Sequence, residues 1–258
     1  MRHFIAFLAV ISSVLFLYFI NKGNQVKTPA AAPHLRVYSY ASFTQAWGPG
    51  PLLKQKFKEK TGMEIDFIES PDSGVLLQRL KLEGPTLGAD MVIGLDQYDL
   101  KRALGELQWK KIDFGNLIKE QGLDPQLENE YFVPYDWGIL SFIARKGTLP
   151  FEPQSLDDLL DPRLRDKIAY EDPRTSSPGL QFLFWVHNQK KSKANDFMKS
   201  LFAQAHSFSP SWSQAYGLFQ KKQALMVFSY VTSTLYHEIE EKNFDTYFLK
   251  FKEPHPVQ

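Results

Sequence analysis

Residues 35–93 alternate between short extended runs and amphipathic runs, and this order constrains the possible folds more than any other feature of the chain. Alternating apolar residues predict a strand at 35–40, and further strands are predicted at 63–68 and 89–93. Helices are predicted between them, at 52–61 after a Gly and Pro break and at 73–83. Right-handed crossovers make such a run a mainly parallel sheet with helices on both faces, so ligands are expected at the carboxyl ends of the strands.

An aromatic segment at 132–145 departs from this rhythm, and a second α/β set follows it. Its predicted elements are strands at 167–170 and 225–229 and helices at 178–188, 194–205 and 213–221. A last strand at 246–251 is expected to cross back. We therefore predict an α/β chain of two lobes, with residues 33–137 in lobe one, 138–245 in lobe two and 246–258 as the return segment.

The N-terminus has the pattern of an export signal. Arg2 and His3 precede an uncharged apolar run at 4–20, and a polar stretch then ends in a small-residue tract at 30–32. The run is slightly long for a signal core and lies at the short limit of a membrane span, roughly 17 to 25 residues. Residues 1–32 are therefore expected to be a signal peptide or a membrane anchor, and either one places the rest of the chain outside the cytoplasmic membrane.

Charge and cysteine content exclude several functions. Without Arg2, Lys22 and Lys27 of the N-terminal segment, 27 basic residues face 29 acidic ones. Such a balanced chain lacks the clustered basic face that displaces counterions from phosphates, so no nucleic-acid partner is expected. The chain has no cysteine, which excludes disulfides, thiol catalysis, cysteine-ligated zinc and a lipid anchor on a cysteine.

Common enzyme signatures are absent from the sequence. It contains no G-x-S-x-G, no GxxxxGK[ST] and no H-E-x-x-H motif. The three histidines in the body of the chain, His187, His206 and His237, are dispersed. We expect them to be surface or packing residues, with no catalytic residue, no metal site, no cofactor and no enzymatic activity.

Aromatic residues occupy predicted strand ends and loops, beside small polar or glycine positions. They are Tyr40, Trp47, Trp212, Tyr230 and Tyr236. Any one of them alone is better explained by packing, but their shared setting predicts loop ends that expose a ring. A ring in that position attracts a cation, for about 0.5 to 2 kcal/mol.

Two helix N-termini offer sites for an anion. In 172–179 a strand leads into a helix whose first turn Pro178 favours, and the Ser176 and Ser177 hydroxyls add hydrogen-bond donors. A simple N-cap is an equally good interpretation of Ser177. Residues 72–74 begin a helix of lobe one in the same way. Rings together with two such termini predict a small-molecule binder, for a flat cation that carries a phosphate.

Six stretches resemble the periplasmic thiamine-binding proteins, which are receptors of ABC importers. They are VYSYASFTQAWGPGP, ADMVIGLD, FVPYDWG, YEDPRTSSPGL, WSQAYGLFQK and FSYVTSTLYHEIEEK. The resemblance implies a type II periplasmic-binding-protein fold, in which two lobes joined by crossing hinge strands close on thiamine, thiamine monophosphate or thiamine diphosphate. It also implies a periplasmic, monomeric protein without a cofactor that delivers its ligand to a membrane permease.

Ligand positions carry over from this resemblance. The matching residues are Ser73, Gly74, Ser176, Ser177, Trp212, Tyr230, Val231, Thr232, Ser233, Tyr40, Tyr236 and, as a weaker match, Trp47. The serine and glycine positions of the two helix N-termini lie on the phosphate side. Tyr40 and Tyr236 are expected to sandwich the pyrimidine, and the segment 230–233 is expected to line the ligand.

Departures from the family pattern bear on the ligand and on the length of the chain. Ser73 stands where the family often has an acid, which is shifted here to Asp72, and Val231 replaces a threonine. Both changes are expected to affect the preferred phosphorylation state. Family members also continue for some tens of residues past Gln258, so we expect the fold to be C-terminally incomplete.

Three other functions stay open at this point. The same fold serves ferric iron and polyamine uptake, although iron sites commonly use adjacent tyrosines, whereas Tyr230 and Tyr236 are six positions apart. Polyamine sites use carboxylates, which are scarce near the motifs in the sequence. A membrane-anchored sensory or interaction module that keeps the fold is the third alternative.

Overall fold

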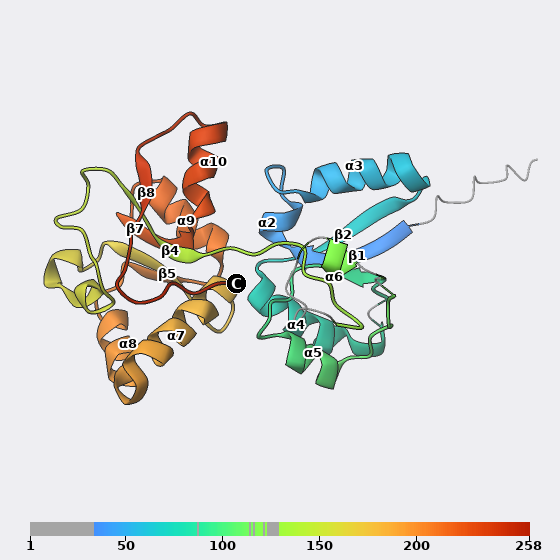
Figure 1. Ribbon diagram of the computed structural model, residues 1–258, viewed down its shortest axis with the longest axis horizontal. Coiled ribbons are helices and arrows are strands. Elements are labelled where there is room, and N and C mark those ends of the chain that lie inside the picture. The colour runs from blue at the N-terminus through green and yellow to red at the C-terminus, as the bar shows by residue number, and fades with distance from the viewer. Residues whose placement is uncertain (1–33, 87, 114, 116, 121, 123–128) are drawn as a thin grey trace, which may run out of the picture.

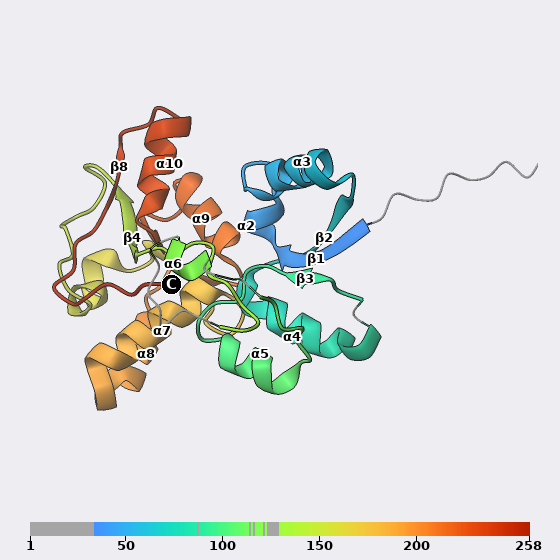
Figure 2. The same cartoon turned by 45° about the vertical axis from the view of Figure 1, so that its right-hand side comes forward.

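The computed structural model describes residues 34–86, 88–113, 115, 117–120, 122 and 129–258, which form two α/β lobes side by side (Figure 1 and Figure 2). The predicted signal peptide or anchor at 1–32 lies outside these residues. None of the helices in the described part of the chain has the length and apolar character needed to span a bilayer.

Lobe one is built on a parallel sheet with the strand order β2-β1-β3. Its strands are β1 (His34–Tyr40), β2 (Glu64–Ser70) and β3 (Met91–Val92). Its helices are α2 (Ala41–Thr44), α3 (Gly50–Thr61), α4 (Ser73–Glu83), α5 (Leu100–Glu106) and α6 (Leu117–Glu120), with a 3-10 turn η1 (Gly84–Thr86). The core forms where Tyr38 of β1 packs against Leu76 and Leu80 of α4.

Local sequence explains where the two long helices of lobe one begin and end. α3 carries Pro51 in its first turn and ends at Gly62, whose φ of 74° lies in the left-handed region. α4 begins after Asp72, whose side chain accepts a hydrogen bond from Gly74 N, and it ends at Gly84. The start of α4 is thereby fixed close to the carboxyl end of β2, as the sequence predicts.

Residues 129–139 cross between the lobes and lead into a mixed five-stranded sheet with the order β6-β5-β7-β4-β8 (Figure 1). Its strands are β4 (Leu140–Arg145), β5 (Ile168–Glu171), β6 (Ser207–Ser209), β7 (Met226–Tyr230) and β8 (Thr246–Phe248). β5 pairs in parallel with β6 and β7, whereas β4 runs antiparallel to β7 and β8. The parallel strands β5, β6 and β7 are followed along the chain by α7, α9 and α10.

Helices pack on both faces of the lobe-two sheet. They are α7 (Ser177–Lys190), α8 (Ala194–Phe202), α9 (Trp212–Gln220) and α10 (Thr232–Glu240), with 3-10 turns η3 (Asp157–Leu160), η4 (Pro162–Leu164) and η5 (Lys191–Lys193). α7 and α8 share an aromatic core in which the Phe142 ring lies 5.3 Å from Phe228 and 5.5 Å from Phe251. α9 covers a smaller cluster around Ile143 and Val227, which point to the opposite face.

The return of the chain toward lobe one differs from the prediction. The strand predicted at 246–251 as the return crossing is instead β8, an edge strand of lobe two that pairs with β4. This segment stays in lobe two because Leu249 and Phe251 are buried in that core. The chain runs back along the crossing segment only at its end, where Gln258 N donates to Gly138 O at 3.0 Å and Gly138 N donates to Gln258 O at 2.9 Å.

Candidate functional site

One carboxylate of lobe one joins the two lobes. Asp72 is 5% exposed, and its Oδ1 accepts hydrogen bonds from Gly74 N at 3.3 Å and, across the lobes, from Ser177 N at 3.2 Å. Its Oδ2 accepts from Trp212 N at 2.8 Å, and the Ser73 hydroxyl donates to Oδ1 at 3.2 Å. The N-termini of α4, α7 and α9 therefore converge on one negative charge, which their dipoles and unpaired N–H groups stabilise.

Gly74 brings the backbones of the lobes into direct contact. A Cβ atom at this position would lie 2.5 Å from Thr175 O and 2.8 Å from Ser176 N, closer than side chains normally come. Ser176 is fully buried, and its hydroxyl has no hydrogen-bond partner. The structure thus brings together the two helix N-termini that the sequence predicts to face one cleft.

Ser177 is the centre of a hydrogen-bond chain that reaches from lobe one to the end of β7. Its hydroxyl donates to Asp96 Oδ2 of lobe one and accepts from Gln258 Nε2 at 2.7 Å. Gln258 Oε1 in turn accepts from the Tyr230 hydroxyl at 3.0 Å. The Tyr230 ring lies against Gly138 of the crossing segment, where a Cβ would come within 2.8 Å of a ring carbon. These contacts fix the position of Tyr230 beside the crossing segment.

Trp212 begins α9 and presents its ring to lobe one. The centroids of the Trp212 and Trp47 rings are 5.9 Å apart with an interplanar angle of 52°. Tyr216 stacks on Trp212 with centroids 5.0 Å apart, and the indole N–H of Trp212 donates to Ser229 Oγ at 2.9 Å. Ser229 Oγ lies 3.0 Å from Ser233 Oγ, so a serine of β7, supported by a serine in the first turn of α10, holds the indole in place. The predicted residues Trp47, Trp212 and Ser233 therefore belong to one connected group.

Tyr40 ends β1 and lies on the lobe-one side of the same region. Its hydroxyl is 2.8 Å from the hydroxyl of Tyr135 in the crossing segment, and its ring packs so closely on Gly94 that a Cβ there would lie 2.2 Å from a ring carbon. Burial is the main cause that raises the pKa of Tyr40, and the charges of Asp136 and Asp72 add to it. Tyr40 is therefore held as a neutral ring next to negative charge.

Carboxylates gather around the tyrosines, contrary to our expectation from the sequence that they are scarce near the motifs. Burial raises the pKa of Tyr230 well above its ordinary value, and the Tyr40 hydroxyl and the charges of Asp72, Asp136 and Asp96 reinforce the shift. The structure collects these acids because they follow different strands or lie in the crossing segment. The region between the lobes is therefore acidic and favours a cation.

A fourth carboxylate, Glu171, ends β5 in a different state. Glu171 is 1% exposed and neither side-chain oxygen has a hydrogen-bond partner from another residue. Burial raises the pKa of Glu171 well above its ordinary value, and the nearby charge of Asp72 acts in the same direction. Burial without a hydrogen-bond partner from another residue therefore favours the protonated form of Glu171, unlike the hydrogen-bonded carboxylate of Asp72.

Among the described residues, Val231, Thr232 and Tyr236 have no hydrogen bond or ring pairing with Tyr40, Trp47 or Trp212. Thr232 and Tyr236 lie exposed on α10, and the Tyr236 ring contacts only His237 among the ring pairs of the described residues, at 6.1 Å. Val231 precedes α10 and its backbone N donates to Ile139 O at 2.9 Å. The predicted sandwich of a pyrimidine between Tyr40 and Tyr236 is thus not preformed in this structure.

Asp96, Tyr135, Ser229 and Gln258 also belong to this connected group, and the sequence analysis assigns none of them a role. Asp96 lies in the ADMVIGLD stretch and Tyr135 in the FVPYDWG stretch. Ser229 precedes the predicted 230–233 segment, whereas Gln258 lies outside every quoted motif. Their roles depend on contacts between distant segments, for which the local sequence contains no signal.

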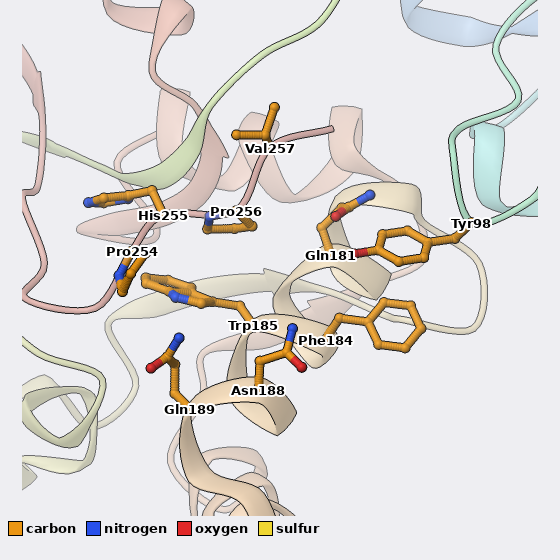
Figure 3. Close-up of a pocket in the computed structure, with 10 residues that line it drawn as sticks. All are labelled: Tyr98, Gln181, Phe184, Trp185, Asn188, Gln189, Pro254, His255, Pro256 and Val257. Atoms are coloured by element: carbon orange, nitrogen blue, oxygen red, sulfur yellow. The ribbon is translucent and has the colours of Figure 1, made fainter. Parts of the chain in front are cut away.

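A cavity of about 220 Å³ lies between α7, Tyr98 of lobe one and the C-terminal residues (Figure 3). The Tyr98 and Phe184 rings close one side with centroids 4.4 Å apart, and His255 stacks on Trp185 at 5.6 Å on the other. None of the residues predicted to bind the ligand lines this cavity. It is a gap between packed rings, separate from the group around Asp72 and Trp212.

Two of the three histidines in the body of the chain, His206 and His237, have structural partners. His237 is buried in α10, where Nε2 lies 2.8 Å from the Tyr216 hydroxyl and Nδ1 lies 2.6 Å from Glu241 Oε2. His206 Nδ1 lies 2.9 Å from Asp166 Oδ1. Within the described ranges, no three side chains among His, Asp and Glu gather in a way that suits a metal ion.

Comparison with known proteins decides the family. The family model described as bacterial extracellular solute-binding protein matches residues 89–253. The thiamine-binding periplasmic protein of Salmonella typhimurium is 37% identical over 229 residues, which are 88% of this chain and 69% of that protein. This chain belongs to the bacterial extracellular solute-binding protein family. The relatives are named as binding proteins, which confirms the prediction of a non-enzymatic family.

Two further comparisons show how much of each protein the similarity covers. The thiamine-binding periplasmic protein of Brucella abortus is 39% identical over 214 residues, and the chain spans 63% of its length. A solved periplasmic thiamin binding protein superimposes with a TM-score of 0.79 at 35% identity, over 88% of this chain and 71% of that one. The predicted type II periplasmic-binding-protein fold and the predicted resemblance to thiamine-binding proteins are therefore confirmed.

Proposed function

We propose that this solute-binding protein binds thiamine and its phosphate esters in the cleft between its lobes. The observation that carries the proposal is the approach of two indoles from opposite lobes, Trp47 and Trp212, whose tilted rings lie 5.9 Å apart beside an acidic group of residues. Thiamine joins a flat pyrimidine to a positively charged thiazolium ring. Aromatic faces attract such a cation, and the surrounding carboxylates strengthen the attraction where water is excluded.

The alternative ligands fit the same residues less well. Carboxylates alone suit a polyamine, but two indole rings beside them favour a flat cation over a flexible aliphatic one. An iron site would need clustered oxygen ligands, yet Tyr230 is bonded to Gln258 and Tyr236 lies exposed on α10. The similarity to thiamine-binding periplasmic proteins at 37–39% identity supports the same choice.

Transport follows from the fold and from the family. The lobes are joined by the crossing segment at 129–139 and by the chain end, so a hinge there would let them open and close on a ligand. We infer that the protein works in the periplasm as a monomer, and that its closed form delivers the ligand to an ABC permease in the cytoplasmic membrane. Neither a nucleic acid nor a cofactor has a part in this function, and anchoring by residues 1–32 is an open variant of the same proposal.

Thermal unfolding of the full chain with different ligands tests the proposal. A ligand that binds only the native state stabilises it by RT ln(1 + [L]/Kd), so the unfolding midpoint rises with the logarithm of the ligand concentration above Kd. Thiamine is expected to raise the midpoint, while putrescine and ferric ion at the same concentration leave it unchanged. An equal shift with putrescine, or a shift with ferric ion alone, would contradict the assignment.

A further inference from the structure

The cavity between α7 and the end of the chain is bordered by both lobes (Figure 3). Tyr98 comes from lobe one, while Phe184 and Trp185 come from α7 and residues 254–257 from the segment after β8. Its volume of about 220 Å³ exceeds that of an apolar cavity that holds benzene, about 150 Å³, and lies below the roughly 300 Å³ at which drug-sized pockets begin. The space therefore suits a molecule with a single ring.

Two buried hydrogen-bond donors belong to residues that line this cavity. Gln181 is 1% exposed and Trp185 is 3% exposed. The amide nitrogen of Gln181 and the indole nitrogen of Trp185 have no hydrogen-bond partner among the described residues. Both residues lie on α7 four positions apart, so they share one side of the helix. A buried N–H without an acceptor is costly, so the cavity favours a molecule that carries hydrogen-bond acceptors.

The amides of Asn188 and Gln189 form the outer part of the cavity. Both residues are exposed, and Figure 3 shows them on the opposite side of the Trp185 ring from His255. An amide donates through its nitrogen and accepts through its oxygen, so both can follow a ligand of either polarity. A ligand that enters past these exposed amides reaches the buried donors of Gln181 and Trp185 at the inner end.

No side chain that lines the cavity carries a formal charge at neutral pH. Its one histidine, His255, accepts a hydrogen bond at Nε2 from Phe251 N at 3.2 Å, and its Nδ1 lies 3.0 Å from Leu140 O. One ring nitrogen thus accepts while the other donates, which is the pattern of a neutral imidazole. An ion in this cavity would lose its hydration without gaining a countercharge, so an uncharged ligand is favoured.

We propose that this cavity is a second binding site, for an uncharged single-ring molecule whose acceptors bond to the N–H groups of Gln181 and Trp185. The site is separate from the group around Asp72 and Trp212, so the inference does not depend on which ligand that group binds. Tyr98 and α7 belong to different lobes, and the Tyr98 and Phe184 rings lie 4.4 Å apart. A ligand in the cavity therefore also holds the two lobes together.

The indole N–H of Trp185 gives a direct signal from the site. In the ¹⁵N-labelled full chain, its NMR resonance is the indole resonance that disappears in Trp185→Phe. The probe is nicotinamide, which has one flat uncharged ring and acceptors on its ring nitrogen and carboxamide oxygen. Nicotinamide is expected to shift the Trp185 resonance saturably, with half-saturation in the millimolar range that is usual for so small a ligand.

Two related compounds test the chemistry of the site. Nicotinate carries a charge and benzene has no strong acceptor, so each is expected to need an at least fivefold higher concentration than nicotinamide for half-saturation. If nicotinamide does not move the Trp185 resonance, or if all three compounds move it at equal concentrations, the inference is wrong.

Calorimetric titration of variants identifies the residues that bind nicotinamide. Gln181→Leu fills a similar volume without the amide donor, and Trp185→Phe keeps a ring without the indole N–H. Each is expected to raise the Kd for nicotinamide at least fivefold. Gln220→Leu makes the first change at an exposed position at the end of α9, outside the cavity, and should bind nicotinamide as the wild type does. Wild-type affinity in both cavity variants would overturn the inference.

A titration in the presence of thiamine separates the cavity from the cleft. Nicotinamide is expected to bind at least as tightly when thiamine is saturating, because the cavity requires Tyr98 of lobe one to lie close to α7. Displacement of nicotinamide by thiamine would place both in the cleft and contradict the second site. If the chain binds nicotinamide with these properties but does not bind thiamine, only the proposed function is wrong.

Discussion

The indole rings of Trp47 and Trp212 lie 5.9 Å apart, one from each lobe. Tyr216 stacks on the Trp212 ring, and the indole N–H of Trp212 donates a hydrogen bond to Ser229 Oγ. A flat cation that contacts both indoles gains contacts with both lobes at once, and closure of the lobes is then coupled to binding. The following predictions test this coupling and the parts of the fold on which it depends.

Truncation of the rings should weaken binding. Trp212→Ala and Tyr230→Ala are each expected to reduce thiamine affinity by at least about 1 kcal/mol, roughly fivefold in Kd, because each removes a ring face from the cation. Isothermal calorimetry measures the loss. Phe244→Ala removes an aromatic ring that is 58% exposed in the loop before β8, and its affinity should equal that of the wild type. If Trp212→Ala and Tyr230→Ala both bind thiamine as tightly as the wild type, these rings do not contact the ligand.

A methyl group at Gly74 should keep the lobes apart. The new Cβ of Gly74→Ala would lie 2.5 Å from Thr175 O, and neither backbone can yield without separating α4 from α7. We expect a larger radius of gyration by small-angle X-ray scattering and at least tenfold weaker thiamine binding. Gly105→Ala in α5 is the matched control, because its Cβ meets no atom within 4 Å. A Gly74→Ala protein with wild-type dimensions and affinity would contradict the interlobe contact.

Asp99 should make stability fall as the pH rises from acid to neutral. Burial, reinforced by the charge of Asp96, raises the pKa of Asp99 to about 6 from 3.8. The folded state therefore binds the Asp99 proton more tightly than the unfolded state does. The stabilisation that this proton gives the folded state is fully present below about pH 4 and is lost as the pH rises past about 6. Between pH 4 and pH 7 the wild type should lose about 2 kcal/mol more than Asp99→Asn, measured by urea unfolding. Parallel pH profiles for the two proteins would refute this.

Phe142→Ala should strongly destabilise lobe two. The Phe142 ring is fully buried and lies within 5.8 Å of Tyr170 and Phe182, in addition to Phe228 and Phe251. Removing a buried phenyl ring leaves a cavity that costs about 3–5 kcal/mol. Chemical unfolding measures this loss, and a change below about 1 kcal/mol would mean that the core collapses around the gap.

Elements with local signals were predictable from the sequence. The helix predicted at 73–83 matches α4 because Asp72 caps it and Gly84 ends it. The sequence predicts a return crossing where β8 lies, because an edge strand has no local mark of its partner and only its pairing with β4 places it in lobe two. β3 is shorter than predicted, with only Met91 and Val92 in the ladder with β1.

The residues of the candidate site also fall into those that local sequence predicts and those that it does not. Rings at strand ends, such as Tyr40 and Trp212, follow from their positions along the chain. The link between Asp72 and Trp212 spans 140 residues, and no local pattern predicts which two strand ends will meet. Tyr236, which the resemblance places at the ligand, lies exposed on α10, where a turn of about 100° per residue decides the side that a ring faces.

Calorimetric titration of thiamine into the folded full chain tests the central claim most directly. The account predicts saturable binding of one thiamine per chain, with an affinity that falls at least fivefold in Trp212→Ala. Folded protein that gives no saturable heat with thiamine, or that binds it equally well without the Trp212 ring, would contradict the account.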